Sequence, residues 1–204
     1  PLASVNGYSK LLLDDMAEVP ETDFKKKSLK TIYSQGQKLQ GLVEKLLNYT
    51  FLDGLEGEET VTATFALSKA CADAAEALRP WLNERNGTVE FNVPQELNAL
   101  GDPGLIRDAI KGLIENAVKF GGGKAELVGA KDGEFVELRV VDKGPGIPPE
   151  EIDKIFGRFY QIDASFTGQV DGWGLGLPFA RKVAQRFGGG VEARSQLGKG
   201  TTVT

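Results

Sequence analysis

An amide and an ammonium group stand three residues apart near the end of a strongly amphipathic segment. Asn116 and Lys119 belong to the run ENAVKF, and residues three apart on a helix lie on one face. An amide oxygen can ligate Mg²⁺, and an ammonium can pair with a phosphate as a point charge. The pair therefore suits a metal–phosphate group, although two polar residues on a solvated helix end have the same spacing.

A second candidate segment, DKGPGIP at residues 142–148, follows directly after an apolar stretch. Gly144 and Gly146 allow backbone conformations that bring the chain close to a ligand. Asp142, at the end of the expected strand, can accept a hydrogen bond from an exocyclic amine such as that of adenine. Taken alone, the same residues also describe an ordinary Gly/Pro turn that begins with Asp.

A third segment, GWGLGLP at residues 172–178, leads into an expected helix. Gly172, Gly174 and Gly176 would expose backbone N–H groups ahead of a helix N-terminus, where the helix dipole favours a phosphate. The G-x-G-x-G spacing differs from the dinucleotide-binding fingerprint, and the βαβ context of that fingerprint is missing. Residues 163–171 are polar, contain glycine and lack periodicity, which predicts a mobile lid ahead of this segment.

These segments fall at the ends of strands and helices expected within residues 60–204. We expect a helix over 68–85 with a kink at Pro80, and further helices over 103–120 and 175–187. Strands are expected at 61–65, 88–93, 124–129, 135–141, 190–194 and 201–204. Because several strands are consecutive, the pattern favours an α/β sandwich whose mixed sheet is covered by helices on one face.

Residues 1–54 show a helical periodicity instead. Heptad-spaced apolar residues predict two helices with a break at 18–21, and a polar linker follows at 53–59. The expected seam consists of Leu2, Val5, Ser9, Leu12, Met16, Val19, Leu29, Ile32, Gly36, Leu39, Val43, Leu46 and Thr50. Two helices cannot cover so wide a face, so we expect two hairpins to form a dimeric four-helix bundle. Packing of both helices onto the rest of the chain is the alternative.

The composition limits the function classes. The 204 residues carry 24 Lys and Arg against 29 Asp and Glu, and the resulting net charge of −5 argues against non-specific nucleic-acid binding. Cys71 is the only cysteine, which excludes a disulfide scaffold. No apolar run reaches the roughly 20 residues of a membrane span, and we expect no signal peptide. Since the chain contains no histidine, its own chemistry must proceed without an imidazole.

Taken in order, these segments resemble the ATP-binding domain of two-component sensor histidine kinases, a fold shared with type II topoisomerases and heat-shock chaperone ATPases. Residues 115–120 are similar to the family's N box, 142–147 to G1, 155–160 to the F box and 172–177 to G2. The run GKGTT at 198–202 is similar to the final glycine–threonine segment. Residues 1–54 resemble the dimerisation and phosphoacceptor hairpin. The resemblance thus implies an α+β protein with a helical domain at 1–54 and an ATP-binding domain at 60–204.

The resemblance also implies a role for each matching residue. Glu115, Asn116 and Lys119 would form the catalytic group, with Asn116 as the Mg²⁺ ligand and Lys119 on a phosphate. Asp142 would bind the adenine amino group, and Phe120 would stack near the base. Arg158 would reach the phosphates, and either Thr201 or Thr202 would help to hold the adenine end. The implied residues of the lid hinges and the phosphate cradle are Gly144, Gly146, Gly172, Gly174 and Gly176, and Leu175 is a further implied nucleotide-binding residue.

Two positions depart from the family's pattern, and a third departure lies at the start of the chain. Trp173 stands where a small residue is usual, and Gln161 stands where a basic residue often follows the F-box aromatic. Pro1 and Leu2 match the end of the family's His-Glu-x-x-x-Pro-Leu box. The resemblance therefore leads us to expect the phosphoacceptor histidine just ahead of Pro1.

The function implied by the resemblance is that of a cytoplasmic histidine kinase core. It would bind ATP and Mg²⁺, pass the γ-phosphoryl to a histidine, and pass it on to an Asp of a response regulator. The expected partners are a second copy of the chain and a response-regulator receiver domain, with no nucleic acid and with a membrane contact only through an upstream anchor. Two alternatives stay open: a catalytically inactive dimeric scaffold or nucleotide sensor of the same fold, and a serine/threonine kinase of the same superfamily.

Overall fold

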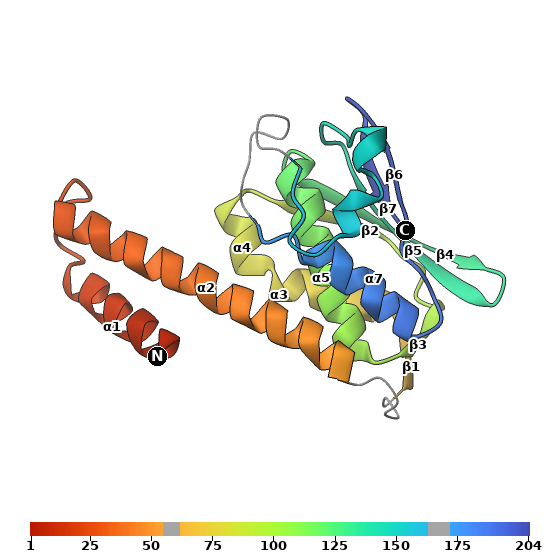
Figure 1. Cartoon of the computed structure of the whole chain (residues 1–204), viewed down its shortest axis with the longest axis horizontal. Coiled ribbons are helices and arrows are strands. Elements are labelled where there is room, and N and C mark those ends of the chain that lie inside the picture. The colour runs from red at the N-terminus through yellow and green to blue at the C-terminus, as the bar shows by residue number, and fades with distance from the viewer. Residues whose placement is uncertain (55–61, 163–171) are drawn as a thin grey trace. The chain divides into compact units, whose positions relative to one another are not determined.

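The computed structural model describes residues 1–54, 62–162 and 172–204 of the chain. The chain divides into two compact units, Pro1–Gly54 and Leu55–Thr204. Figure 1 labels the helices and strands of both units. Among the described residues, no helix combines the length and the apolar character that a membrane crossing requires.

The first unit is a hairpin of two helices, α1 (Leu2–Asp15) and α2 (Phe24–Gly54), as the heptad pattern predicts. The Asp23 carboxylate accepts a hydrogen bond of 3.0 Å from the Lys26 backbone N–H, which caps the start of α2. This bond fixes where the second helix begins.

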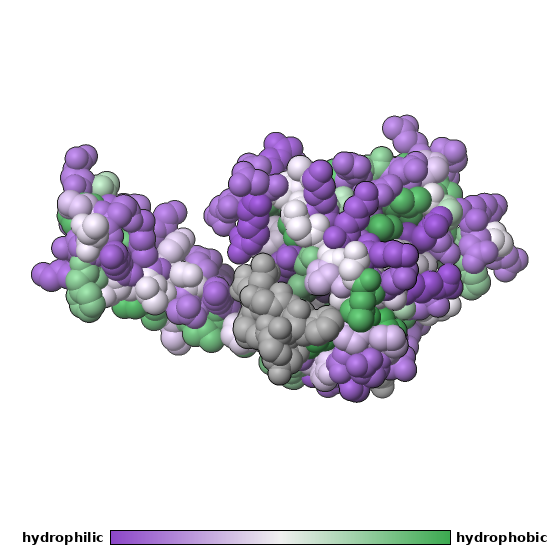
Figure 2. Space-filling model, turned by 90° about the horizontal axis from the view of Figure 1, so that it is seen from above, coloured by the Kyte–Doolittle hydropathy of each residue, from purple (hydrophilic) through white to green (hydrophobic). Residues whose placement is uncertain are grey.

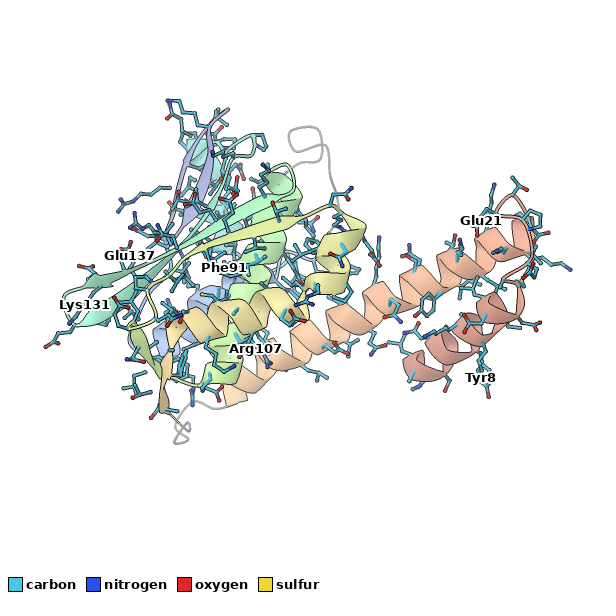
Figure 3. All side chains as sticks on the ribbon, turned by 180° about the vertical axis from the view of Figure 1, so that it is seen from behind. Tyr8, Glu21, Phe91, Arg107, Lys131 and Glu137 are labelled. Carbon is cyan, nitrogen blue, oxygen red and sulfur yellow. The ribbon has the colours of Figure 1, made fainter. Side chains whose placement is uncertain are left out.

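The turn between α1 and α2 is closed by a buried lysine. The Lys26 ammonium donates hydrogen bonds to the carbonyl oxygens of Ala17 at 3.1 Å and Val19 at 2.6 Å, and it lies 3.2 Å from the carboxylate of Glu21. Figure 3 labels Glu21 at this end of the hairpin. Carbonyl groups beyond the end of α1 thereby gain a charged donor, which sets the path of the chain into α2.

Polar and small residues, rather than the apolar seam, form the closest contact between α1 and α2. Asn6 and Ser9 are buried in the single hairpin. The Asn6 amide donates a hydrogen bond of 2.9 Å to Gln40, and a Cβ on Gly36 would lie 2.0 Å from the Asn6 side-chain oxygen. The heptad-spaced apolar side chains consequently keep a large part of their surface exposed.

The second unit is an α/β sandwich, as predicted from the order of its elements. Its helices are α3 (Leu67–Ala77), α4 (Arg79–Glu84), α5 (Pro103–Phe120) and α7 (Gly176–Arg186), with short 3₁₀ turns η1 (Pro149–Glu151) and η2 (Lys154–Phe156). Its strands are β1 (Ala63–Ala66), β2 (Thr88–Asn92), β3 (Asn98–Gly101), β4 (Lys124–Asp132), β5 (Phe135–Asp142), β6 (Ala193–Gln196) and β7 (Gly200–Val203).

The main sheet has the strand order β2-β4-β5-β7-β6 and is mixed, since β2 pairs parallel to β4 and the other neighbours pair antiparallel. Helices α3, α5 and α7 form one layer against it (Figure 1). Ala125 and Leu127 on β4 are buried under this layer, together with Ile114 of α5. The opposite face carries charged side chains such as Glu137, labelled in Figure 3, which pairs with Arg139 at 2.8 Å.

Several sequence-based boundaries change in the structure. The expected single helix over 68–85 is wrong, because the chain breaks at Leu78 and Pro80 lies in the first turn of a separate helix, α4. Strand β3 was not expected; it pairs antiparallel with β1 in a two-stranded sheet. Strand β6 begins three residues later than the expected start at 190. The break at Leu78 and the extra pair β1–β3 both lie away from the glycine-rich segments.

Candidate functional site

The C-terminal end of α5 forms the middle of the candidate site. Asp102 caps the start of this helix by accepting hydrogen bonds from the N–H groups of Gly104 at 2.7 Å and Leu105 at 2.9 Å. Its apolar stripe faces the sheet and is buried at Leu113, Ile114, Ala117 and Val118. Because the stripe fixes the rotation of α5, Glu115, Asn116 and Lys119 fall on its remaining faces, where the burial is only partial.

Asp142 lies at the end of β5 and is held by backbone donors. Its Oδ1 accepts hydrogen bonds from the N–H of Gly144 at 2.8 Å and from the N–H of Thr201 at 3.3 Å. Burial raises the pKa of this carboxyl above its ordinary value of 3.8, and the two hydrogen bonds oppose that rise. Both bonds engage Oδ1, so they orient the carboxylate without using its second oxygen.

The loop after Asp142 approaches the end of α5 so closely that only glycine fits. A Cβ on Gly144 would lie 2.2 Å from the Phe120 carbonyl oxygen, and one on Gly121 would lie 2.7 Å from Cβ of Asp142. Gly146 has a φ of +78°, and a Cβ there would lie 2.3 Å from the carbonyl oxygen of Gln196. The G1-like loop is therefore enclosed between the end of α5 and the β6–β7 turn.

The third segment meets the same helix end from another side. A Cβ on Gly176 would lie 3.4 Å from the Asn116 side-chain amide nitrogen, and one on Gly172 would lie 3.7 Å from the Lys119 ammonium. Gly112 and Gly176 also allow the backbones of α5 and α7 to approach each other. The predicted polar pair of α5 thus faces the glycine-rich turn that starts α7.

The F-box-like segment is tied to that glycine-rich turn. The Phe159 N–H donates a hydrogen bond of 3.0 Å to the Gly174 carbonyl, and both residues have positive φ angles near +60°. Phe156 is buried beneath the Arg181 guanidinium, which lies 3.5 Å from the centre of its ring. The Tyr160 hydroxyl donates to the Glu151 carboxylate. These contacts anchor both sides of the segment that connects η2 with α7.

The remaining predicted positions divide by location. Thr201 pairs with Asp142 across β5 and β7, whereas Thr202 pairs with Val141 and so points to the opposite face of the sheet. Leu175 is buried at the start of α7, and Arg158 is exposed in the loop after η2. Register thus selects Thr201, rather than Thr202, as the neighbour of Asp142.

The two departures near the expected lid have defined surroundings. The Gln161 amide donates a hydrogen bond of 2.7 Å to the Gly172 carbonyl, and Trp173 is 39% exposed. The expected lid at 163–171 lies outside the described residues. Gln161 and Gly172, which stand on either side of it in the sequence, are linked directly.

One participant was missed by the sequence reasoning. The Ser195 hydroxyl lies within hydrogen-bond distance of Ile147, Gly200 and Thr201 and so joins the G1-like loop to the β6–β7 hairpin. Its position on a short strand carries no motif. The only sequence signal is that Ser195 stands in a polar strand next to the GKGTT run.

Comparisons with known proteins agree with this architecture. Residues 1–54 match the His Kinase A (phospho-acceptor) domain, and residues 101–204 match the histidine kinase-, DNA gyrase B- and HSP90-like ATPase family. The sensor protein SrrB of Staphylococcus aureus (strain MRSA252) is 30% identical over 206 residues, which cover 99% of this chain and 34% of SrrB. The sensor protein CreC of Escherichia coli (strain K12) is 32% identical over 197 residues, which cover 96% of this chain and 40% of CreC.

The fold is also found among solved structures. The crystal structure of full-length ShkA in complex with AMPPNP superposes with a TM-score of 0.74 at 27% identity, covering 100% of this chain and 42% of ShkA. The chain therefore belongs to the histidine kinase-, DNA gyrase B- and HSP90-like ATPase family. Since a phosphoacceptor-type hairpin precedes the ATPase fold, it has the organisation of a two-component sensor kinase core and spans about a third of the length of SrrB.

Proposed function

We propose that this chain is a sensor histidine kinase core that binds ATP with Mg²⁺ at the end of α5. The observation that carries the proposal is the contact of this helix end with both glycine-rich segments. Gly144 approaches it at Phe120, and Gly172 approaches it at Lys119. A nucleotide bound there would place its base near Asp142 and its phosphates near the start of α7, where the helix dipole favours negative charge.

The residues fit a magnesium–nucleotide complex better than a metal held by protein alone. In the described parts of the chain, no group of three or more Cys, Asp or Glu side chains gathers around one point. Mg²⁺ in phosphate-transfer sites is commonly held by one or two protein ligands together with phosphates and water. The Asn116 amide would supply the protein ligand, Lys119 and Arg158 would neutralise phosphate charge, and Glu115 would stand beside the reacting group.

Binding should be measured first, by calorimetry with AMPPNP in the presence and absence of Mg²⁺. The parent chain should bind one equivalent, and Asn116→Ala should lose the Mg²⁺-dependent part of the affinity. Asn83→Ala is a matched control because Asn83 is exposed on α4. If the parent chain had no affinity for AMPPNP or ADP, the proposal would fail.

Phosphoryl transfer distinguishes the kinase from an inactive nucleotide-binding scaffold. The natural gene product, incubated with ATP labelled at the γ-phosphate, should acquire acid-labile, base-stable phosphate that moves to an Asp of a receiver domain. The 204-residue chain contains no histidine, so it should stay unlabelled under the same conditions. Nucleotide binding without any labelled histidine in the gene product would favour the scaffold, and acid-stable label would favour the serine/threonine kinase.

The exposed seam of the hairpin supports a homodimer. Predicted seam residues keep 42–51% of their surface exposed in the single hairpin, namely Val5, Leu12, Ile32, Leu39, Val43 and Leu46. Green, hydrophobic patches along the helical pair are visible in Figure 2. A second hairpin would cover them by closing a four-helix bundle, so the hydrophobic effect favours association.

Light scattering tests the homodimer. The parent chain should have the mass of two copies, and Leu39→Glu should shift it to one. Leu100→Glu is the control, because Leu100 is 65% exposed and belongs to the second unit. A parent chain that is monomeric at high concentration would contradict the bundle.

A further inference from the structure

Three polar side chains form a row across the strands beneath the candidate base site. Asp142 on β5 is the register partner of Thr201 on β7, and Thr201 is in turn the partner of Ser195 on β6. Direct partners in antiparallel strands point to the same face and stand next to each other. The row thus begins at the carboxylate proposed to bind the base and ends at a serine that no motif marks.

The Ser195 hydroxyl makes three contacts that determine where its proton goes. It accepts a hydrogen bond from the Ile147 N–H at 2.8 Å, and it lies 2.9 Å from the Gly200 carbonyl oxygen and 2.9 Å from the Thr201 hydroxyl oxygen. A hydroxyl has one proton and two lone pairs. The Ser195 hydroxyl donates to the Gly200 carbonyl, which can only accept, and with its one proton used there the Thr201 hydroxyl is the donor in the contact between the two hydroxyls.

This arrangement leaves the Thr201 hydroxyl oxygen with lone pairs only. Thr201 is 8% exposed, so its hydroxyl has little bulk water with which to exchange partners. Its neighbour Asp142 also offers an acceptor, since a carboxylate has no proton. The edge of the proposed base site thereby presents two acceptors and no hydroxyl donor.

We propose that Ser195 is a positioning residue that makes this site select a 6-aminopurine over a 6-oxopurine. The inference rests on the proposed nucleotide site and adds a reason for its choice of base. An amino group at position 6 donates hydrogen bonds to the two acceptors. A 6-oxopurine instead has an acceptor at position 6 and a donor at its protonated N1. Ser195 contacts Thr201 and the G1-like loop, and it acts through them.

Ser195 also holds the G1-like loop in place, and this structural role has to be separated from the selection of the base. The Ile147 N–H bonds to it, and beside that bond the Gly198 N–H donates to the Pro145 carbonyl at 2.7 Å. Loss of Ser195 as a loop anchor alone would weaken every nucleotide by the same factor. Loss of the hydrogen bond that Thr201 donates to Ser195 would change the ratio of the dissociation constants of two nucleotides that differ in their base.

The experiment compares ADP with inosine diphosphate, whose base has a 6-oxo group, on the parent chain and on Ser195→Ala. In the variant the Thr201 hydroxyl is released and can donate, so the ratio of the two dissociation constants should fall about tenfold, the effect of one hydrogen bond. Ser195→Thr keeps the hydroxyl and should restore the ratio. Thr64→Ala removes an exposed strand hydroxyl on β1 and should leave both constants unchanged.

An unchanged ratio in folded Ser195→Ala, with both nucleotides weakened equally, would overturn the inference while leaving the proposed site intact. If the alanine variant lacks the parent circular dichroism spectrum, Thr201→Val supplies the test. It keeps the Thr201 N–H that Asp142 uses and removes the acceptor, so the ratio should again fall, and a constant ratio would overturn the inference. A parent chain that binds neither nucleotide would overturn both the proposed function and this inference.

Discussion

Replacing Asp142 by Asn separates ligand binding from stability in one substitution. The Asp142 Oδ1 accepts from two backbone N–H groups, at 2.8 and 3.3 Å, and an asparagine carbonyl can accept both bonds. The asparagine NH₂ then takes the place of the second carboxylate oxygen, and a donor faces the donor of the base. Losing one charge-assisted hydrogen bond is worth about 1.5–3 kcal/mol, so ADP should bind roughly 10- to 150-fold more weakly.

The same substitution should not reduce stability at neutral pH. Burial raises the pKa of Asp142, so the folded state favours the protonated carboxyl. The stability that this form contributes is complete below the ordinary pKa of 3.8 and is lost as the pH rises through the raised pKa. At pH 7 the buried carboxylate costs stability, and Asp142→Asn removes that cost. The free energy of unfolding of the variant should equal or exceed that of the parent at pH 7, with a smaller difference at pH 4.

Both effects can be measured in the whole chain with probes that report on the second unit. Trp81 and Trp173 are the only tryptophans, so their fluorescence during urea unfolding reports on that unit, and calorimetry reports ADP binding. Asp132→Asn is the control, because Asp132 is exposed at the tip of the β4–β5 hairpin. Unchanged ADP affinity would refute the base contact, and a loss of stability at pH 7 would refute the electrostatic reasoning.

Three further predictions concern packing. Gly144→Ala places a Cβ 2.2 Å from the Phe120 carbonyl oxygen, so it should cost about 1–3 kcal/mol of stability and abolish ADP binding. Gly190→Ala is the control and should do neither, because a Cβ at Gly190 would have no neighbour within 4 Å. Lys26→Met leaves the Ala17 and Val19 carbonyls of the hairpin turn without their charged donor and should cost about 1–3 kcal/mol in urea unfolding followed by circular dichroism. Equal stability of this variant and the exposed control Lys25→Met would contradict the capping role. Burial raises the pKa of the Cys71 thiol to about 12, so iodoacetamide should label it at pH 8 only in urea, and rapid labelling of the folded chain would show that α3 opens.

Elements with strong local signals could be predicted from the sequence. Helix α5 occupies Pro103–Phe120 as expected, because its start, its apolar stripe and the glycines after it are all encoded locally. Strand β3 was missed because its four residues gain their partner from β1, more than thirty positions earlier in the sequence.

The candidate site divides in the same way. The glycine-rich segments could be found because close backbone approach restricts the residue type, as at Gly144 and Gly176. Ser195 could not be found, since its contact with Ile147 joins residues 48 positions apart and any serine on a short strand looks alike in sequence. The choice between Thr201 and Thr202 likewise required the strand register.

Hydrogen exchange with and without ADP and Mg²⁺ tests most directly whether the three glycine- and asparagine-bearing segments form one site. Peptides covering residues 116–120, 142–147 and 172–177 should all gain protection, with half-saturation at the same ADP concentration. Protection of one segment alone, or half-saturation at different concentrations, would contradict a single nucleotide site at the end of α5.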